Sequence, residues 1–229
     1  NPYTYVENNV MGFLNILEGC RNHGVKHLVF ASSSSVYGMG KQVPFAESCD
    51  TSHPVSLYAA TKKSDEVMAY SYASLYGFQT TALRFFTVYG PWGRPDMAPI
   101  KFMDAIANGR PIQVFNQGNM LRDFTYIDDI VEGIRCVIEA HYADKVPARV
   151  YNIGCSHPVK LIHFIHTIEE ATGRQAQMIM MDMQPGDVTR TDADTTSLEH
   201  DFGFHPTTDI HEGVARLYAW YKKVWPTIQ

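Results

Sequence analysis

The stretch HLVFASSSSVYG, residues 27–38, gives the strongest indication of fold in this chain of 229 residues. Residues 27–33 form a short run of strand-forming residues without polar alternation, which is typical of a strand buried on both faces of a parallel sheet. Before it, residues 4–22 have helical periodicity and are followed by Gly24, placed as a helix C-cap glycine. We therefore expect a helix that leads directly into a buried strand.

Helices and strands continue to alternate after this strand. A polar loop runs to about residue 55, residues 56–76 are predicted to form a helix that Gly77 ends, and residues 80–88 (TTALRFFTV) are predicted to form a strand. Strands that alternate with helices of this length imply a doubly wound parallel sheet. The predicted fold class is therefore α/β, with a partial doubly wound, Rossmann-like sheet and a smaller α/β lobe.

The smaller lobe is indicated where the alternation loosens after Gly90. The further elements expected are a helix ending at Gly109, a strand at 112–115, a helix through 130–138, a strand at 150–154, a helix at 161–172, a strand at 175–181 and a helix at 210–225. We expect the larger domain to comprise residues 1–88 and 122–155, and the lobe to comprise residues 89–121 and 156–229.

The composition excludes several classes of partner. With a formal net charge of -5, we expect no nucleic-acid partner, so any bound anion must meet a local cluster of Arg or Lys. No apolar run approaches the roughly 20 residues that cross a bilayer, so we expect no membrane contact. The 4 cysteines lack CxxC spacing and the 10 histidines are scattered, which indicates reduced thiols in a cytoplasmic protein and no metal site.

The segment YAATK, from Tyr58 to Lys62, is the first candidate for chemistry. On the predicted helix, the spacing i, i+4 places both side chains on one face. A phenol has a reference pKa near 10 and is a poor base at neutral pH, but a nearby ammonium stabilises its phenolate by about 1.4 kcal/mol for each unit by which it lowers that pKa. Lys62 would thereby make Tyr58 usable as a base, although a Tyr and a Lys at this spacing also arise by chance.

A run of hydroxyl groups, from Ser32 to Ser35, ends the strand that begins at His27. The carboxyl ends of the strands border the ligand crevice of a doubly wound sheet. These serines can therefore hydrogen-bond a substrate hydroxyl and share its proton with a phenolate. The alternative is a serine-rich loop that is merely solvated.

Four segments, in this order and separation, resemble the extended short-chain dehydrogenase family, whose members epimerise, dehydrate or decarboxylate nucleotide sugars. They are SSSSVYG at 32–38, YAATK at 58–62, LRFFTVYGP at 83–91 and RDFTYIDD at 122–129. Within the family, RFFTVYGPWGRPDM at 84–97 looks like UDP-glucuronate 4-epimerases. The resemblance covers essentially the whole chain and implies NAD as cofactor and a UDP-sugar as substrate.

The resemblance also implies a reaction: epimerisation at carbon 4, with UDP-glucuronate giving UDP-galacturonate through a 4-keto sugar. Tyr58 would remove the proton of the sugar 4-hydroxyl, and Lys62 would also hold the nicotinamide ribose. The catalytic residues implied are Tyr58, Lys62, Ser33, Ser34 and Ser35, and the cofactor-binding residues implied are Asn8, Tyr58, Lys62, Phe85 and Phe86.

The residues that the resemblance implies for substrate binding are Thr87, Arg94, Met97, Lys101, Gln113, Phe115, Arg122 and Arg190. Arg94 is assigned to the sugar carboxylate, because a planar guanidinium grips a carboxylate through two parallel hydrogen bonds. Arg122 matches the family's phosphate-binding Arg, and Arg190 follows the PGD segment at 185–187, which usually faces the nucleotide. Gln113 and Phe115 match the strand beside the uracil.

A glycine-rich turn of the GxxGxxG type, through which the family holds the NAD pyrophosphate, does not occur in the 229 residues. By register, on the order of 90 residues, or three strand-helix units of ~30 residues each, are absent. We expect this chain alone to hold NAD poorly and to be inactive. In this interpretation the larger domain is the C-terminal part of an NAD-binding domain, and the lobe binds the nucleotide sugar.

The resemblance further implies a homodimer through the helices at 4–22 and 56–76, and a role in polysaccharide biosynthesis. Decarboxylation, dehydration and epimerisation of a neutral UDP-sugar are alternatives within the same family. A non-catalytic nucleotide-sugar-binding protein that kept the fold without the cofactor is the alternative from a different class.

Overall fold

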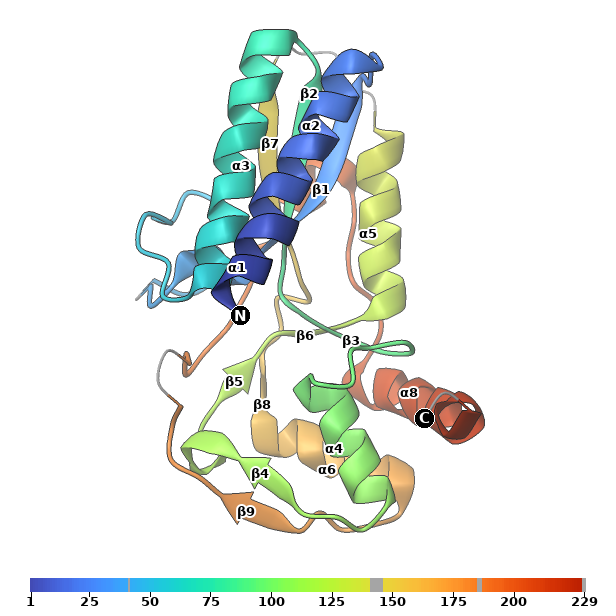
Figure 1. The fold of residues 1–229 in the computed structure, drawn as a ribbon. Coiled ribbons are helices and arrows are strands. Elements are labelled where there is room, and N and C mark those ends of the chain that lie inside the picture. Colours follow the sequence, from blue (N-terminus) through green and yellow to red (C-terminus); the bar gives the residue numbers. More distant parts are fainter. Residues whose placement is uncertain (41, 141–145, 185–186, 228–229) are drawn as a thin grey trace. The chain divides into compact units, whose positions relative to one another are not determined.

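The computed structural model describes residues 1–40, 42–140, 146–184 and 187–227, which form two compact units (Figure 1). The first unit consists of Asn1–Phe86, Ile134–Ile153 and Ala193–Phe204, and the second of Thr87–Gly133, Gly154–Asp192 and His205–Gln229. These boundaries differ from the predicted ones, because residues 87–88, 122–133 and 154–155 cluster with the second unit and residues 193–204 with the first.

Long-range pairing explains why residues 193–204 join the first unit. Phe45 and Ala193 form a parallel bridge, and Asn152 Nδ2 donates a hydrogen bond to the Asp194 carbonyl at 3.0 Å. The segment includes α7 (Thr196–Phe202), a helix that the sequence analysis did not predict. Such pairing between distant segments leaves no periodic pattern in the sequence.

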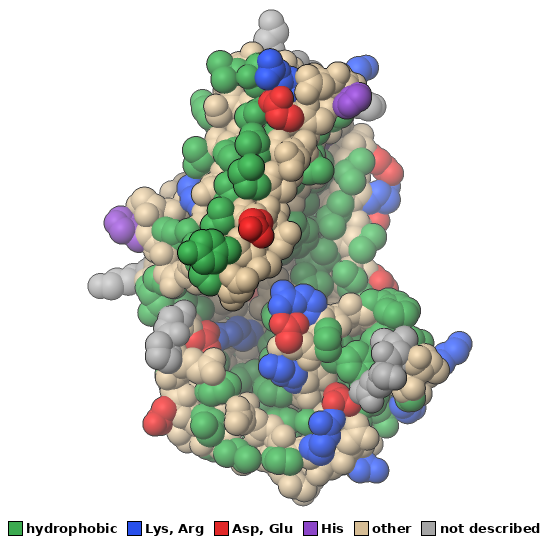
Figure 2. Space-filling view, in the orientation of Figure 1, with side chains coloured by type: hydrophobic (Ala, Val, Ile, Leu, Met, Phe, Trp, Pro, Cys, Tyr) green, Lys and Arg blue, Asp and Glu red, His purple; other side chains and the backbone are tan. Residues whose placement is uncertain are grey.

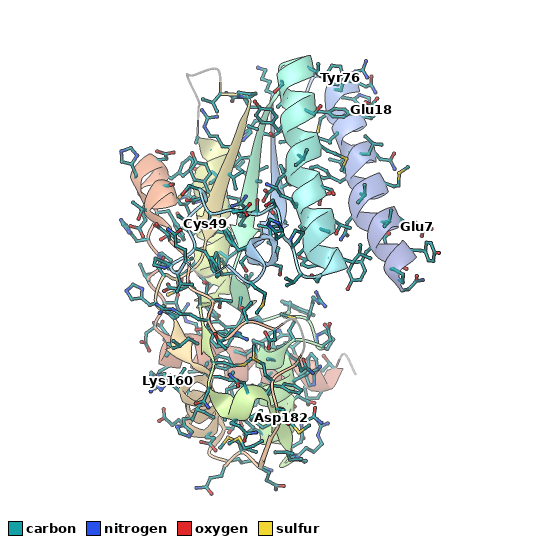
Figure 3. The ribbon with its side chains drawn as sticks, turned by 90° about the vertical axis from the view of Figure 1, so that its left-hand side faces the viewer. Glu7, Glu18, Cys49, Tyr76, Lys160 and Asp182 are labelled. Carbon is teal, nitrogen blue, oxygen red and sulfur yellow. The ribbon has the colours of Figure 1, made fainter. Side chains whose placement is uncertain are left out.

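The first unit is built around a three-stranded parallel sheet with the strand order β1-β2-β7. The strands are β1 (His27–Ser33), β2 (Gln79–Phe85) and β7 (Ala148–Ile153). Helices α2 (Gly12–Asn22) and α3 (Leu57–Tyr76) lie on one side of this sheet, and α5 (Ile127–Glu139) lies on the other (Figure 1, Figure 3). The parallel pairing confirms the predicted α/β fold class.

Helix α3 begins and ends where its capping residues predict. Ser56 Oγ accepts a hydrogen bond from Ala59 N at 3.1 Å, and Gly77 ends the helix with φ 77°, a left-handed conformation that glycine adopts without strain. Figure 3 shows α2 and α3 side by side, with Glu18 and Tyr76 at the same end. The Tyr72 hydroxyl on α3 donates to Glu18 on α2 at 2.7 Å.

The helix expected at 4–22 is continuous but has three parts. These are α1 (Pro2–Tyr5), a π-helical segment (Val6–Met11) and α2. A π turn has a wider hydrogen-bond spacing than an α turn, so it changes which residues face a neighbouring helix.

The single strand predicted at 80–88 is two strands in the structure. β2 ends at Phe85, and Phe86 N still donates to the Ile153 carbonyl at 3.1 Å. Thr87 N instead donates to the Asp123 carbonyl at 3.2 Å. Here β3 (Thr87–Tyr89) begins, and it pairs with a strand of another sheet. The prediction was wrong here because the backbone changes its pairing partner without any break in the apolar pattern.

The second unit packs short strands and helices around one apolar core. β3 pairs in parallel with β6 (Phe124–Tyr126), β4 (Ile112–Val114) in parallel with β9 (Met178–Met180), and β5 (Leu121–Arg122) antiparallel with β8 (Val159–Lys160). Its helices are α4 (Ala98–Ala107), α6 (Leu161–Thr172), α8 (Ile210–Val224) and the first part of α5. The core includes the rings of Phe124 and Phe164, stacked with centroids 4.2 Å apart.

Candidate active site

Ser33 closes β1 and caps the short 3-10 helix Ser34–Tyr37 that follows it. Its Oγ accepts a hydrogen bond from Ser35 N at 3.2 Å and donates one to Ser35 Oγ at 3.1 Å. Ser33 is buried, Ser34 is half-buried and Ser35 is exposed. The three predicted hydroxyl groups therefore lie together at the carboxyl end of β1 but at different depths.

Lys62 joins α3 to that same end of β1. Its Nζ donates to the Ala31 carbonyl at 3.0 Å, two residues before Ser33. Tyr58 lies one turn earlier on α3 and is half-buried, with its ring centroid 6.2 Å from that of Tyr5. Within the described part of the chain, the Tyr58 hydroxyl has no hydrogen-bond partner. The face of α3 that carries the Tyr-Lys pair is thus held against the serine-bearing strand.

The π-helical segment turns Asn9, not Asn8, toward α3. Asn9 Nδ2 donates to Thr61 Oγ1 at 2.9 Å, whereas Asn8 is exposed. Thr61 is the neighbour of Lys62, so Asn9 is the amide that reaches the Tyr-Lys helix. The family resemblance gave Asn8, and the sequence carries no separate signal for the neighbouring Asn9.

The two phenylalanines matched to the cofactor have different surroundings. Phe85 is the half-buried last residue of β2. Phe86 is 4% exposed, and its ring centroid lies 6.4 Å from that of Tyr37 in a small apolar cluster. Phe86 is therefore part of the core of the first unit.

A buried polar network begins at Ser32, the neighbour of Ser33. Arg84 on β2 donates from Nε and Nη2 to the two carboxylate oxygens of Glu66 at 2.8 and 2.9 Å, and Ser32 Oγ donates to Glu66 at 2.7 Å. Arg84 Nη1 also donates to the Tyr37 hydroxyl at 3.0 Å, and this hydroxyl donates to Asn152 Oδ1 at 2.6 Å. These contacts tie all three strands of the sheet to α3.

The electrostatics of the network follow from its burial. Burial opposes ionisation of Glu66, but the hydrogen bonds from Arg84 and Ser32 outweigh it and lower the pKa of the carboxyl group. Burial raises the pKa of Tyr37 to about 12. Sequence reasoning missed this network, although Arg84 stands inside an apolar strand and a charged side chain there requires a buried partner.

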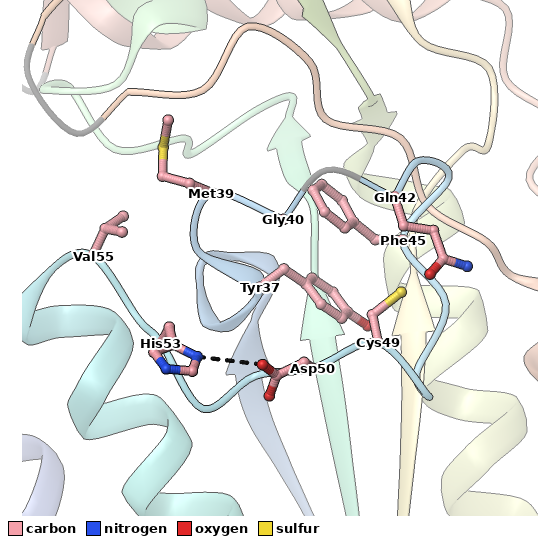
Figure 4. A pocket seen from close by; sticks show the side chains of 9 residues that line it. All are labelled: Tyr37, Met39, Gly40, Gln42, Phe45, Cys49, Asp50, His53 and Val55. Atoms are coloured by element: carbon pink, nitrogen blue, oxygen red, sulfur yellow. Dashed lines mark hydrogen bonds and ion pairs between the residues drawn. The ribbon is translucent and has the colours of Figure 1, made fainter.

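The loop between the serines and α3 forms a cavity of about 380 Å³ (Figure 4). Tyr37 and Phe45 stack in it with ring centroids 4.8 Å apart, and Asp50 and His53 form an exposed pair at 3.3 Å. Gly38 closes the loop at φ 58°, where an added Cβ would lie 2.5 Å from the His53 carbonyl oxygen. The sequence analysis did not predict this cavity.

The second unit has its own cavity, of about 300 Å³. Five of the residues predicted to bind substrate line it: Thr87, Met97, Gln113, Phe115 and Arg122. The other lining residues described are Ala98, Pro99, Phe102, Met120, Phe124, Leu161 and Asp187. Residues that are scattered between positions 87 and 122 in the sequence therefore come together around one space.

Among the described residues that line this cavity, Arg122 carries the positive charge. Its Nη2 donates to Asp187 Oδ1 at 2.9 Å, and its Nη1 donates to the Leu121 carbonyl at 3.0 Å. Burial lowers the pKa of the Arg122 guanidinium, and the Asp187 carboxylate opposes that shift. Residues 185–186 of the PGD segment lie outside the described residues.

The three other residues predicted to bind substrate do not line this cavity. Arg94 is 72% exposed and grips Asp96 with two hydrogen bonds, from Nε at 3.0 Å and from Nη2 at 2.5 Å. Arg190 Nη2 donates to Asp192 Oδ2 at 2.6 Å, and Lys101 is exposed on α4.

The described residues include neither a candidate metal-binding cluster nor a helix that could cross a membrane. None of the described His, Cys, Asp and Glu side chains form a group of three or more that could hold a metal ion. None of the described helices has the length and apolar character needed to cross a membrane.

Residues 1–154 match the model of the NAD dependent epimerase/dehydratase family. The chain is 50% identical to protein CapI of Staphylococcus aureus, over 96% of this chain and 70% of that protein. It is 49% identical to a probable UDP-glucuronate 4-epimerase of Rhizobium meliloti (strain 1021), over 96% and 69%. The crystal structure of UDP-glucuronic acid 4-epimerase from Bacillus cereus, in complex with UDP-glucuronic acid and NAD, superposes with a TM-score of 0.89 at 30% identity, over 96% and 68%.

Proposed function

The chain belongs to the NAD dependent epimerase/dehydratase family, and from this premise we propose that the protein catalyses epimerisation at carbon 4 of a UDP-sugar. The proposed pair is UDP-glucuronate and UDP-galacturonate, interconverted through a 4-keto sugar. The names of the Rhizobium meliloti and Bacillus cereus relatives support this choice of sugar. The motif at residues 84–97, which resembles UDP-glucuronate 4-epimerases, agrees with this choice.

The hydrogen bond from Lys62 to Ala31 carries the proposal. It places an ammonium at the carboxyl end of β1, which is the side of a doubly wound sheet where ligands bind. An ammonium has three N–H donors, and Ala31 and Asp65 accept two hydrogen bonds from this one. One donor is left for a ligand, as the proposed contact with the nicotinamide ribose requires, so the residues present fit this part of NAD.

In the proposed mechanism, Tyr58 takes the proton from the sugar 4-hydroxyl and returns it when the sugar is reduced again. Lys62 stabilises the phenolate, and Ser33 shares the proton through its hydroxyl group. Bound NAD would supply the hydride acceptor and donor for carbon 4. Asn9 holds the helix of Tyr58 and Lys62 through Thr61.

The cavity of the second unit supports the assignment of a UDP-binding lobe. Arg122 uses part of its five-donor guanidinium on Leu121 and Asp187, so other N–H groups are available for the oxygens of a diphosphate. Gln113 offers an amide to the uracil and Phe115 an aromatic face. Thr87 and Met97 line the same cavity.

Arg94 is the proposed contact of the sugar carboxylate. It makes a bidentate pair of hydrogen bonds with Asp96, so its Nε and Nη2 donors have the geometry to bind the two oxygens of a carboxylate. A glucuronate carboxylate presents the same pair of oxygens, which a neutral hexose lacks. Loss of carbon dioxide from the 4-keto acid requires that the breaking bond align with the carbonyl group, and a fixed guanidinium would oppose that alignment.

We also propose a homodimer through the α1–α2 helix and α3. Hydrophobic side chains line the outward face of the α1–α2 helix in Figure 2. On this helix, Met11 and Ile16 are 52% and 54% exposed, and on α3, Tyr70 and Leu75 are 59% and 71% exposed. A second copy of the same two helices would cover such a surface with a two-fold symmetric contact.

Product analysis tests the proposed reaction. The full-length protein, as its gene encodes it, is incubated with UDP-glucuronate and NAD, and the products are separated. We expect UDP-galacturonate, and we expect Tyr58→Phe to abolish its formation. A pentose product would identify a decarboxylase. Turnover of UDP-glucose alone would identify a neutral-sugar epimerase, and binding of UDP without turnover of any UDP-sugar would identify a non-catalytic protein.

A further inference from the structure

A third ionisable residue follows the Tyr-Lys pair on α3. Tyr58, Lys62 and Asp65 occupy positions i, i+4 and i+7, which lie on one face of a helix. Asp65 is 1% exposed, although Asp is almost never fully buried unless it is paired. The family resemblance assigns no role to this residue.

Asp65 has one satisfied and one unsatisfied oxygen. Its Oδ2 accepts a hydrogen bond from Lys62 Nζ at 3.2 Å, and its Oδ1 is buried without a partner among the described residues. Lys62 Nζ, on a side chain that is 18% exposed, also donates to the Ala31 carbonyl at 3.0 Å. Two protein acceptors on different elements thus fix the ammonium, and one of them is charged.

We propose that Asp65 is a positioning residue for the catalytic Lys62, and that it also balances the charge of that ammonium. The Ala31 carbonyl alone leaves the amine free to rotate about its long side chain. The second contact, from one turn further along α3, fixes the direction of the remaining N–H. The inference rests on the function proposed above, because it concerns the residue that holds the cofactor and activates Tyr58.

The surroundings of Asp65 argue against a purely structural role. Burial raises the pKa of its carboxyl group, the Lys62 ammonium opposes this shift, and the Glu66 carboxylate adds to it. Glu66 is itself held by Ser32 on β1 and by Arg84 on β2. An ionised Asp65 therefore costs the fold free energy at neutral pH, and such a cost is expected where a group serves catalysis.

Asp65→Asn in the full-length, NAD-loaded protein tests the proposal, with Glu18→Gln as the matched acid-to-amide control. Glu18 lies on the neighbouring helix α2, where it accepts a hydrogen bond from Tyr72 on α3. We expect Asp65→Asn to lower kcat about tenfold, because small misplacements of a positioning group cost rates of this order or more. We also expect it to weaken the affinity for NAD, because the direction of the remaining Lys62 N–H is then no longer fixed. Glu18→Gln should change neither.

A lower kcat with an unchanged affinity for NAD would overturn the proposal, since a merely structural residue would give that result. If the unsubstituted protein turns over no UDP-sugar, the proposed function itself fails. The affinity for NAD then still separates the two failures, because Asp65→Asn should weaken NAD binding even where no sugar is turned over. An affinity for NAD equal to that of the wild type would overturn the inference about Asp65.

Discussion

The buried pair of Arg84 and Glu66 predicts a large loss of stability on Glu66→Gln. The two side chains are 3% and 4% exposed, and the guanidinium meets both carboxylate oxygens. The substitution keeps an acceptor for one hydrogen bond but leaves the charge of Arg84 uncompensated. Removing one partner of a buried pair costs about 3 kcal/mol or more, which corresponds to a fall in Tm of roughly 6–12 °C for a protein of this size.

Urea unfolding followed by circular dichroism measures this loss. The matched control is Glu139→Gln on α5, whose carboxylate pairs with Arg135 while the two side chains are 61% and 53% exposed. Solvent screening limits such a surface pair to less than about 1 kcal/mol. If Glu66→Gln and Glu139→Gln lowered the free energy of unfolding equally, the reasoning from burial would be refuted.

The pH dependence of this loss has a definite sign. The pKa of Glu66 is lower in the folded protein than its ordinary value of 4.5. The stabilisation is therefore fully present above that value and is lost as the pH falls through the folded-state pKa. The difference between wild type and Glu66→Gln should shrink in acid, and a difference that grew there would contradict the assignment of the ionised pair.

Three further predictions concern the substrate and the dimer. Arg122→Ala should weaken UDP binding by roughly tenfold or more in calorimetry, because it removes charge-assisted hydrogen bonds. Arg110→Ala should leave the affinity unchanged, and equal affinities of the two variants would contradict the assignment of Arg122 to the diphosphate. Arg94→Ala should raise the KM for UDP-glucuronate about tenfold and release carbon dioxide, with no such rise for UDP-glucose. Leu75→Glu should convert the proposed dimer to a monomer in light scattering, whereas Ile138→Glu on α5 should leave it intact. A dimer in both would argue against the proposed interface through the α1–α2 helix and α3.

Local signals in the sequence were sufficient to predict β1 and α3 in the first unit. The strand at 27–33 is an apolar run, and the helix after Ser56 has a capping residue at each end. The prediction was wrong where the partner of a segment changes, as at Phe86, and where residues 193–204 return to the first unit. These features depend on contacts between distant segments, so no local pattern encodes them.

The candidate site was only partly predictable for similar reasons. The spacing of Tyr58 and Lys62 predicted a shared helix face, but not that the ammonium would bind Ala31 and Asp65. The resemblance gave residues between 87 and 122 that the structure brings around one cavity. It also gave Asn8, which is exposed, whereas the neighbouring Asn9 donates a hydrogen bond to Thr61 on α3.

The most direct test of the proposed mechanism follows the hydrogen on carbon 4. The full-length protein is given NAD and UDP-glucuronate that carries deuterium at that carbon, and the product is examined by NMR and mass spectrometry. If Tyr58 and Lys62 start an oxidation whose hydride returns to the same carbon, the UDP-galacturonate formed will retain the deuterium at carbon 4. Loss of the deuterium to water would contradict the account.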